Sequence, residues 1–539
     1  MSTRYTESLY QALCDMVEVM RLHGVVNVVL SPGSRSAPLA LSFMRNGKFD
    51  VYHIVDERSA GYFGLGLAKA TMRPTVLVCT SGTATYNYAP AVAEAYFQEI
   101  PLLVLTSDRP QEWIGQNDNQ AIFQQQLFGE HALQFHQMPH SYEAAEDRSF
   151  AIQKVNEACL KSQGLKKGPV HLNFPFREPF YPEGPIPEPS SDLRVVRTET
   201  SHVGLSKMLV HDVLTTIASS KNIWILAGMS ASKMDAQPIA DFVARTGAIA
   251  CIDPLANMEM ESSVNNYDHW LKTTVEEKPD LVISFGNHFL SKSLKQFVRN
   301  NKPKNHIHIQ EHDVLADPFG SIQFLVQSKL SYFFKQLNEF LPVPQTLPAN
   351  PFLEMEQVVE GELDAELLAA KALIEALPED CVLHMGNSTP VRYLLRWQHL
   401  LKNKGIEVFA NRGTSGIDGS VSTAVGMSQG DSRKHVLIIG DLSMYYDRNG
   451  LWNNYLNGGF SIVVMNNQGG GIFKRINGPK QQSELEAYFV NQQPTDFQSM
   501  ALEHGFTYQL LSAKEVGSDA FTQKLEGAFL GQMFTEVRL

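Results

Sequence analysis

The sequence predicts an α/β protein made of three doubly wound domains, each built on a parallel sheet. The chain has 539 residues, enough for about three domains of ordinary size. Short apolar runs recur along it, and each is followed by a turn rich in glycine or serine and then by a helical pattern. Near-continuous apolar strands that alternate with helices are typical of parallel sheets covered on both faces.

Two proline-rich stretches divide the chain. They are residues 181–190, YPEGPIPEPS, and residues 341–352, LPVPQTLPANPF. Proline continues neither a helix nor a central strand, so such stretches usually link domains. We therefore expect domains over residues 1–185, 195–342 and 352–539.

Each predicted domain contains four apolar runs that are typical of strands. The first has GVVNVVLSPGS, VYHIVDE, PTVLVCTSGTA and IPLLVLTSDRP; the second has KNIWILAGMSAS, AIACIDP, PDLVISFGN and NHIHIQ; the third has CVLHMGNS, IEVFANRG, KHVLIIGDLS and FSIVVMNNQGG. In such sheets ligands bind beyond the carboxyl ends of the strands. The residues directly after each run are therefore the candidates for a functional site.

Composition argues against a nucleic-acid partner and favours a reducing compartment. The formal net charge is −12 and the pI is about 5.8, whereas nucleic-acid-binding proteins usually present a basic face. The N-terminus carries charge throughout, and no apolar run approaches the roughly 18 residues of a membrane span. The cysteines lack CxxC spacing, which favours free thiols in a reducing compartment: Cys14, Cys79, Cys159, Cys251 and Cys381. We expect a cytoplasmic protein without a nucleic-acid partner or a membrane span.

Two polar motifs follow apolar strands in the third domain. Asp441 comes directly after the run HVLIIG, and Asn467 follows the run FSIVVMN. A carboxylate, an amide oxygen and a backbone carbonyl near Gly469 are oxygen ligands of the kind that Mg²⁺ prefers when it binds a diphosphate. Glycines and a following helix N-terminus favour the phosphates. Each motif alone is also typical of a helix N-cap or a turn, but the pair at strand ends is much more specific.

The pair GDLS and NNQG resembles the GDG…NN motif of thiamine-diphosphate-dependent enzymes. Leu442 departs from that motif, where glycine or alanine is usual, and GDLS is similar to the form found in the menaquinone-pathway family of 2-succinyl-5-enolpyruvyl-6-hydroxy-3-cyclohexene-1-carboxylate (SEPHCHC) synthases. The family's other motifs occur in order along the whole chain: PGSRS, DERSAGYFGLGLAK, TSGTA, DRP, NQAI, GNS with a later arginine, NRGTSGIDG, GDLS and NNQGGGIF.

The resemblance implies a thiamine diphosphate site with Mg²⁺ or Mn²⁺. The first domain would bind the pyrimidine and the third the diphosphate. Glu57, at the end of the run VYHIVDE, would activate the aminopyrimidine ring, although an acid in the first turn of a helix also complements the helix dipole. Ile417 would hold the cofactor bent, and Asp441, Asn467 and Gly469 would bind the metal. The implied cofactor-binding residues are Glu57, Thr83, Gly386, Ser388, Gly416, Ile417, Gly440, Asp441, Leu442, Ser443, Asn467, Gly469, Gly470 and Ile472.

Arginines in turns and at run ends indicate an anionic substrate. Guanidinium groups bind carboxylates through paired hydrogen bonds, although each arginine alone is also typical of a surface ion pair. The residues that the resemblance places around the substrates are Ser34, Arg35, Arg109, Gln120, Lys292, Ser388, Arg392 and Arg412, with Ile472 and Phe473 as an apolar wall. The family often has Lys-Arg where this chain has Lys292-Ser293, so an ordinary surface lysine stays an alternative there.

The reaction implied by the resemblance is decarboxylation of 2-oxoglutarate and conjugate addition of the remaining carbanion to isochorismate. The resemblance also implies a dimer or tetramer with active sites between chains. The middle domain looks like a nucleotide fold, but its turn AGMSAS lacks GxGxxG spacing, so we expect no flavin or nicotinamide there. Another thiamine-dependent carboligase or 2-oxo-acid decarboxylase, or a binding protein without activity, remains the alternative.

Overall fold

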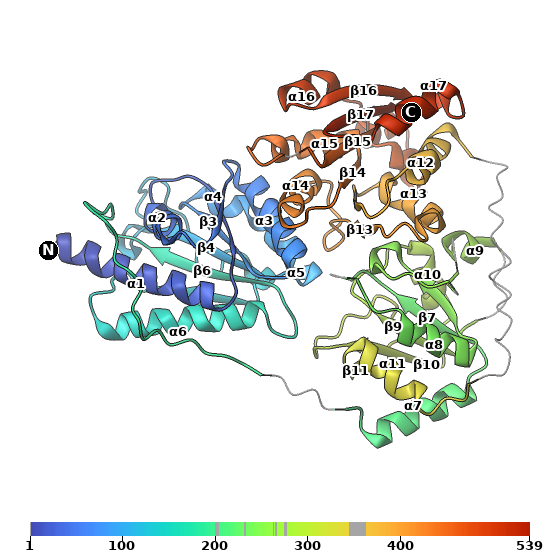
Figure 1. Ribbon diagram of the computed structural model, residues 1–539, viewed down its shortest axis with the longest axis horizontal. Coiled ribbons are helices and arrows are strands. Elements are labelled where there is room, and N and C mark those ends of the chain that lie inside the picture. Colours follow the sequence, from blue (N-terminus) through green and yellow to red (C-terminus); the bar gives the residue numbers. More distant parts are fainter. Residues whose placement is uncertain are drawn as a thin grey trace. The chain divides into compact units, whose positions relative to one another are not determined.

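Three parallel sheets with helices between their strands confirm the predicted α/β class (Figure 1). The computed structural model describes residues 2–199, 204–230, 233–261, 263–264, 267–273, 278–343, 363–456 and 458–539. The second proline-rich stretch therefore lies outside the described residues from position 344 onward. The chain forms two compact units. The first comprises Met1–Thr200, Gly413–Arg433 and Ser443–Phe460, and the second comprises Ser201–Arg412, Lys434–Leu442 and Ser461–Leu539.

The first unit contains a six-stranded sheet with the order β2-β1-β3-β4-β6-β5. Its strands are β1 (Asn27–Leu30), β2 (Asp50–His53), β3 (Thr75–Cys79), β4 (Leu102–Asp108), β5 (Gln134–Gln137) and β6 (Pro169–Pro175). Its helices are α1 (Ser2–Leu22), α2 (Ala37–Asn46), α3 (Glu57–Thr71), α4 (Thr83–Asn87), α5 (Ala89–Gln98), α6 (Ala145–Ser162) and α14 (Ser420–Gly430). All neighbouring strands pair in parallel, so their carboxyl ends share one edge of the sheet.

The second unit contains two further parallel sheets. The five-stranded sheet, order β11-β10-β9-β7-β8, has strands β7 (Ile223–Ala227), β8 (Ile249–Ile252), β9 (Leu281–Phe285), β10 (Asn305–Gln310) and β11 (Phe324–Gln327). The six-stranded sheet, order β13-β12-β14-β15-β17-β16, has strands β12 (Val382–Met385), β13 (Glu407–Phe409), β14 (His435–Gly440), β15 (Phe460–Asn466), β16 (Thr507–Ser512) and β17 (Met533–Arg538). The helices that follow their strands include α10 (Lys292–Asn300) and α13 (Thr389–Trp397), whereas α15 (Asp441–Tyr446) begins in this unit and belongs to the first unit from Ser443 onward.

The twelve predicted strands form, but five observed strands were not expected, namely β5, β6, β11, β16 and β17. Strand β6 shows why an apolar run is an incomplete signal. It is fully buried, yet it carries His171 and Asn173 at its centre. Both side chains are hydrogen-bonded to Thr106 on β4, so polar residues are buried there in pairs and interrupt the run.

Two other expectations concern burial and membranes. All five cysteines are buried free thiols, as predicted. Among the described residues, no helix is both long enough and apolar enough to cross a bilayer.

Helices α3 and α14 of the first unit pack with their backbones in contact. A Cβ atom at Gly66 on α3 would overlap the carbonyl oxygen of Thr423, and one at Gly426 on α14 would overlap that of Phe63. Only glycine permits this approach, and at both positions the obstacle is backbone, which cannot swing away. The paired glycines therefore fix α3 against α14.

We expect Gly66→Ala to destabilise the first unit, because the added methyl group would force the two helices apart. Overpacking of this kind costs about 1–3 kcal/mol, so the midpoint of thermal unfolding should fall by several degrees in calorimetry. Gly184→Ala is the matched control, since a Cβ there meets nothing within 4 Å. Equal midpoints for the two variants would show that the helix contact is not tight.

Candidate active site

Glu57 begins helix α3 and lies at the carboxyl edge of the first sheet. Strand β2 ends at His53, so the expectation that Glu57 ends a strand is wrong. The cause is Asp56, whose side chain accepts hydrogen bonds from the backbone N–H groups of Arg58 and Ser59. Asp56 therefore caps the helix, and Glu57 is the first helical residue. Partial burial raises the pKa of Glu57, and its carboxylate forms no ion pair with a described residue. The group is thus available to a ligand.

The start of α3 is also held from outside the helix. Asn449 donates a hydrogen bond from Nδ2 to Asp56 Oδ2 at 2.7 Å. The guanidinium of Arg58 donates to the carbonyl oxygen of Tyr446 at 2.8 Å and stacks over its ring. The position of Glu57 is therefore set by contacts on both neighbouring residues.

The turn that carries Gly416 and Ile417 belongs to the same unit, and a buried carboxylate holds its start. Glu94 on α5 accepts hydrogen bonds from the backbone N–H groups of Gly413 and Thr414, both at 2.7 Å. Burying a carboxylate is costly unless its oxygens are satisfied. The two N–H bonds, with the Thr414 hydroxyl as a third donor, satisfy Glu94 and lock the turn.

Helix α3 and helix α15 hold the end of that turn. Tyr62 donates its hydroxyl hydrogen to Asp418 Oδ2 at 2.8 Å, and Ser443 donates to the carbonyl oxygen of Ile417 at 2.5 Å. The Ile417 side chain nevertheless remains 38% exposed. The backbone of Ile417 is thus fixed while its apolar side chain stays uncovered, which is the form expected of a support for a ligand.

A chain of buried amides connects two further predicted positions. Thr83 begins α4, and the backbone N–H of the preceding Gly82 donates to Gln124 Oε1 at 3.0 Å. Gln124 in turn donates to Asn173 Oδ1 at 2.9 Å, and Asn173 donates to Asp108 Oδ2 at 2.7 Å. The network therefore links the turn of Thr83 to the end of β4, where Arg109 follows. Burial raises the pKa of Asp108 to about 7, against the hydrogen bond from Asn173 and the charge of Arg35.

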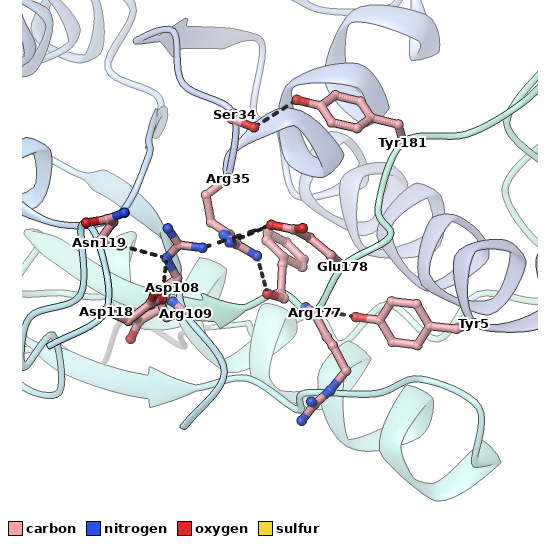
Figure 2. A network of polar contacts seen from close by, with 11 residues as sticks. Tyr5, Ser34, Arg35, Asp108, Arg109, Asp118, Asn119, Arg177, Glu178 and Tyr181 are labelled. Atoms are coloured by element: carbon pink, nitrogen blue, oxygen red, sulfur yellow. Dashed lines mark hydrogen bonds and ion pairs between the residues drawn. The ribbon is translucent and has the colours of Figure 1, made fainter. Parts of the chain in front are cut away.

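Ser34, Arg35 and Arg109 lie close together, as Figure 2 shows. The Arg35 guanidinium donates to the carbonyl oxygen of Phe176 at 2.9 Å and to Glu178 Oε1 at 3.0 Å. Arg109 lies 4.0 Å from the same carboxylate oxygen. Predicted Gln120 is exposed in the loop after Asn119, whose carbonyl oxygen accepts a hydrogen bond from Arg109 Nε at 3.0 Å. The structure thus gathers these predicted substrate residues in the first unit.

Asp441 and Asn467 come together at the carboxyl ends of neighbouring strands β14 and β15 in the second unit. Asp441 is buried, and its Oδ2 accepts a hydrogen bond from the backbone N–H of Gly469 at 2.7 Å. Burial raises the pKa of Asp441 to about 6. The Oδ1 atom of Asn467 is buried and has no hydrogen-bond partner among the described residues. An unpaired buried oxygen beside a buried carboxylate fits a hard cation such as Mg²⁺.

The backbone around this pair leaves room for phosphates. A Cβ at Gly440 would meet nothing within 4 Å, and the backbone N–H of Leu442 donates to Asp441 Oδ1 at 2.8 Å. Directly after the adjacent strand β12, Gly386 packs against Ile439, and Ser388 takes the left-handed φ of 78° just before α13. Such a turn at a helix start leaves backbone N–H groups free for an anion.

Lys292, Arg392 and Ile472 line one pocket of about 710 Å³ in the second unit. Lys292 begins α10, and Arg392 lies on α13 with its guanidinium on the carbonyl oxygen of Ser388 at 2.5 Å. Neither residue forms an ion pair with any described carboxylate. Burial lowers the pKa of Arg392, so its charge is held in a partly dry site. Ser293, the position that departs from the family pattern, lines the same pocket.

Two arginines in this pocket were missed at the sequence level. Arg396 lies one helical turn after Arg392, and its Nε is buried without a hydrogen-bond partner among the described residues. Arg475 also lines the pocket, but Asp364 and Glu366 pair with it at 2.8 and 2.7 Å. The four-residue spacing of Arg392 and Arg396 predicts that both lie on one face of a helix, so the sequence carried a signal for Arg396. The presence of Arg475 in the pocket depends on the fold.

The remaining predicted residues lie near these groups. The Arg412 guanidinium donates to Asn387 Oδ1 at 3.0 Å, next to Ser388. Ile472 and Phe473 share a short 3₁₀ helix after Gly470, and the Phe473 ring packs on Phe489 with 5.5 Å between ring centres. The predicted residues therefore form two sets, one in each compact unit.

Comparison with known proteins identifies the family of the chain. The family described as thiamine pyrophosphate enzyme, N-terminal TPP binding domain, matches residues 13–130. A 2-succinyl-5-enolpyruvyl-6-hydroxy-3-cyclohexene-1-carboxylate synthase of Cytophaga hutchinsonii is 38% identical over 98% of this chain and 95% of its own length. Synthases of the same name from Porphyromonas gingivalis and Flavobacterium psychrophilum are each 34% identical, over 93% and 95% of this chain and 90% and 92% of their own lengths.

These matches confirm the resemblance carried by GDLS, NNQG and the other motifs. They extend over almost the whole chain. They also confirm that the chain is an enzyme of the thiamine diphosphate class. The chain therefore belongs to the SEPHCHC synthase family of thiamine-diphosphate-dependent enzymes.

Proposed function

We propose that this chain makes SEPHCHC and carbon dioxide from 2-oxoglutarate and isochorismate, as a step of menaquinone biosynthesis. The observation that carries the proposal is the name shared by relatives that match nearly its full length. Two cationic sites in an acidic chain support it, because both substrates carry more than one carboxylate. Arg35 and Arg109 form one site, and Lys292, Arg392 and Arg396 form the other.

Thiamine diphosphate, when bound, supplies a carbon nucleophile and stabilises the carbanion left by decarboxylation. Asp441, Asn467 and the Gly469 carbonyl would hold Mg²⁺ or Mn²⁺, and the metal would hold the diphosphate. The open backbone at Gly440 and the turn at Ser388 would leave space and donors for the phosphates. The unpaired Oδ1 of Asn467 is the atom that best supports this assignment.

Glu57 would move a proton at the pyrimidine ring. Its raised pKa and lack of an ion pair suit a group that shares a proton with a ring nitrogen. The exposed side chain of Ile417, fixed by its carbonyl bond to Ser443, would support the bent cofactor. The remaining proposed cofactor contacts are Thr83, Gly416, Leu442, Gly470 and Ile472.

The substrate carboxylates would bind to the two cationic sites. A guanidinium in a partly dry pocket binds a carboxylate more strongly than it would in water, and it stabilises charge that develops during addition. Ser34, Gln120, Ser388 and Arg412 would add hydrogen bonds, and Phe473 would cover the apolar part of the ring. Lys292 is exposed at the pocket, which agrees with either a substrate contact or a surface lysine.

We also propose the assembly and the domains. The chain would work in the cytoplasm as a dimer or tetramer with active sites between chains. The pyrimidine-binding domain would cover residues 1–185, the central domain 195–342 and the diphosphate-binding domain 352–539, each around one of the three sheets.

The substrate pair is tested by turnover with thiamine diphosphate and Mg²⁺. We expect carbon dioxide and SEPHCHC to form at useful rates only when 2-oxoglutarate and isochorismate are both supplied. Mass spectrometry measures the products. Pyruvate is the comparison substrate. Faster decarboxylation of pyruvate than of 2-oxoglutarate would instead favour another thiamine-dependent carboligase or decarboxylase.

The role of Glu57 is tested by Glu57→Gln. The amide keeps the shape but cannot share a proton with the ring, so kcat should fall at least about 100-fold while the cofactor still binds. Glu146→Gln is a matched control, because Glu146 is an exposed acid in the first turn of α6. Normal turnover by Glu57→Gln would contradict this role and would show that Glu57 only complements the dipole of its helix.

A further inference from the structure

The segment after β6 contacts three of the proposed substrate residues at once. Its residues Glu178 and Tyr181 reach back across the carboxyl edge of the first sheet (Figure 2). Glu178 pairs with Arg35 at 3.0 Å and with Arg109 at 4.0 Å. The Tyr181 hydroxyl lies 2.9 Å from the hydroxyl of Ser34. The segment thus occupies polar positions that the proposed function assigns to a substrate.

The side chains of Arg35 and Arg109 are both mostly buried. The side chain of Arg35 is only 7% exposed, and it is held by the Phe176 carbonyl and by the Phe180 ring beneath its guanidinium. Arg109 is held by the carbonyl oxygen of Asn119 and by Asp118 at 3.3 Å. Both guanidinium groups therefore keep their places through contacts that do not involve Glu178.

Glu178 differs from its partners because its side chain is 69% exposed. An exposed carboxylate gains little from an ion pair and can turn into water at small cost. One guanidinium nitrogen of the buried Arg35 donates a hydrogen bond to a backbone carbonyl, and another donates to the carboxylate of Glu178. An incoming carboxylate must therefore take the place of Glu178.

We propose that Glu178 is a resident anion between Arg35 and Arg109 that the substrate carboxylate displaces, and that it thereby sets substrate affinity. This inference rests on the proposed function, since it deepens the use of that same site. Glu178 acts through the two arginines and is a positioning residue. Together with Asp118 it offsets the two like charges when no substrate is bound, and the need to displace it lowers the apparent affinity of the site for carboxylates.

The test is Glu178→Gln in the full chain with thiamine diphosphate and Mg²⁺, at fixed ionic strength. Glutamine can still accept a hydrogen bond from Arg35 but no longer competes as an anion. The KM of at least one of the two substrates should fall about threefold or more, with a smaller change in kcat. Glu183→Gln is the matched control, because it removes the same charge from the same segment at a residue without an ion pair to a described group. Its KM values should equal those of the wild type.

Unchanged or higher KM values for both substrates in Glu178→Gln would overturn the inference, because Glu178 would then only support Arg35. A second readout separates this failure from a failure of the proposed function. Succinate, a simple dicarboxylate, is titrated into each protein by calorimetry. If the wild-type chain turns over neither substrate, the proposed function fails, and the succinate titration alone decides the inference. Tighter succinate binding by Glu178→Gln than by Glu183→Gln supports it, and equal or weaker binding overturns it.

Discussion

The backbone contact between α3 and α14 is the constraint on which the first half of the site depends. Glycine at positions 66 and 426 lets the two helices touch without intervening side chains. Helix α3 begins with Glu57, and α14 follows directly after the turn that carries Ile417. Because the helices cannot slide on each other, the Glu57 carboxylate and the Ile417 side chain are held in a fixed relation within one compact unit.

The buried carboxylates of Glu94 and Asp441 both accept backbone N–H groups, whereas the amide oxygen beside Asp441 has no hydrogen-bond partner among the described residues. Glu94 receives two backbone N–H groups and so fixes the turn before Ile417. Asp441 likewise accepts the N–H of Gly469, but the neighbouring Asn467 Oδ1 has no partner among the described residues. This unpaired oxygen is the observation that supports the proposed cation site.

The sequence was sufficient for the fold class, for twelve of the strands and for the strand-end positions of Asp441 and Asn467, because these depend on local patterns. It was insufficient for β6, whose buried His171 and Asn173 break the apolar run by bonding to another strand. It also missed Glu178 and Arg475. Both residues lie beside functional candidates that are distant in sequence, namely Arg35 for the first and Lys292 for the second. Only the folded chain brings these neighbours near.

The central claim is that Asp441 and Asn467 hold the metal that binds thiamine diphosphate, and calorimetric titration of the cofactor tests it most directly. The account predicts binding that requires Mg²⁺ and is weakened at least about tenfold by Asp441→Ala. Asp212→Ala, which changes an exposed aspartate on α7 (Lys207–Ser219), should bind as the wild type does. Unchanged affinity in Asp441→Ala, or no binding by the wild-type chain, would contradict the account.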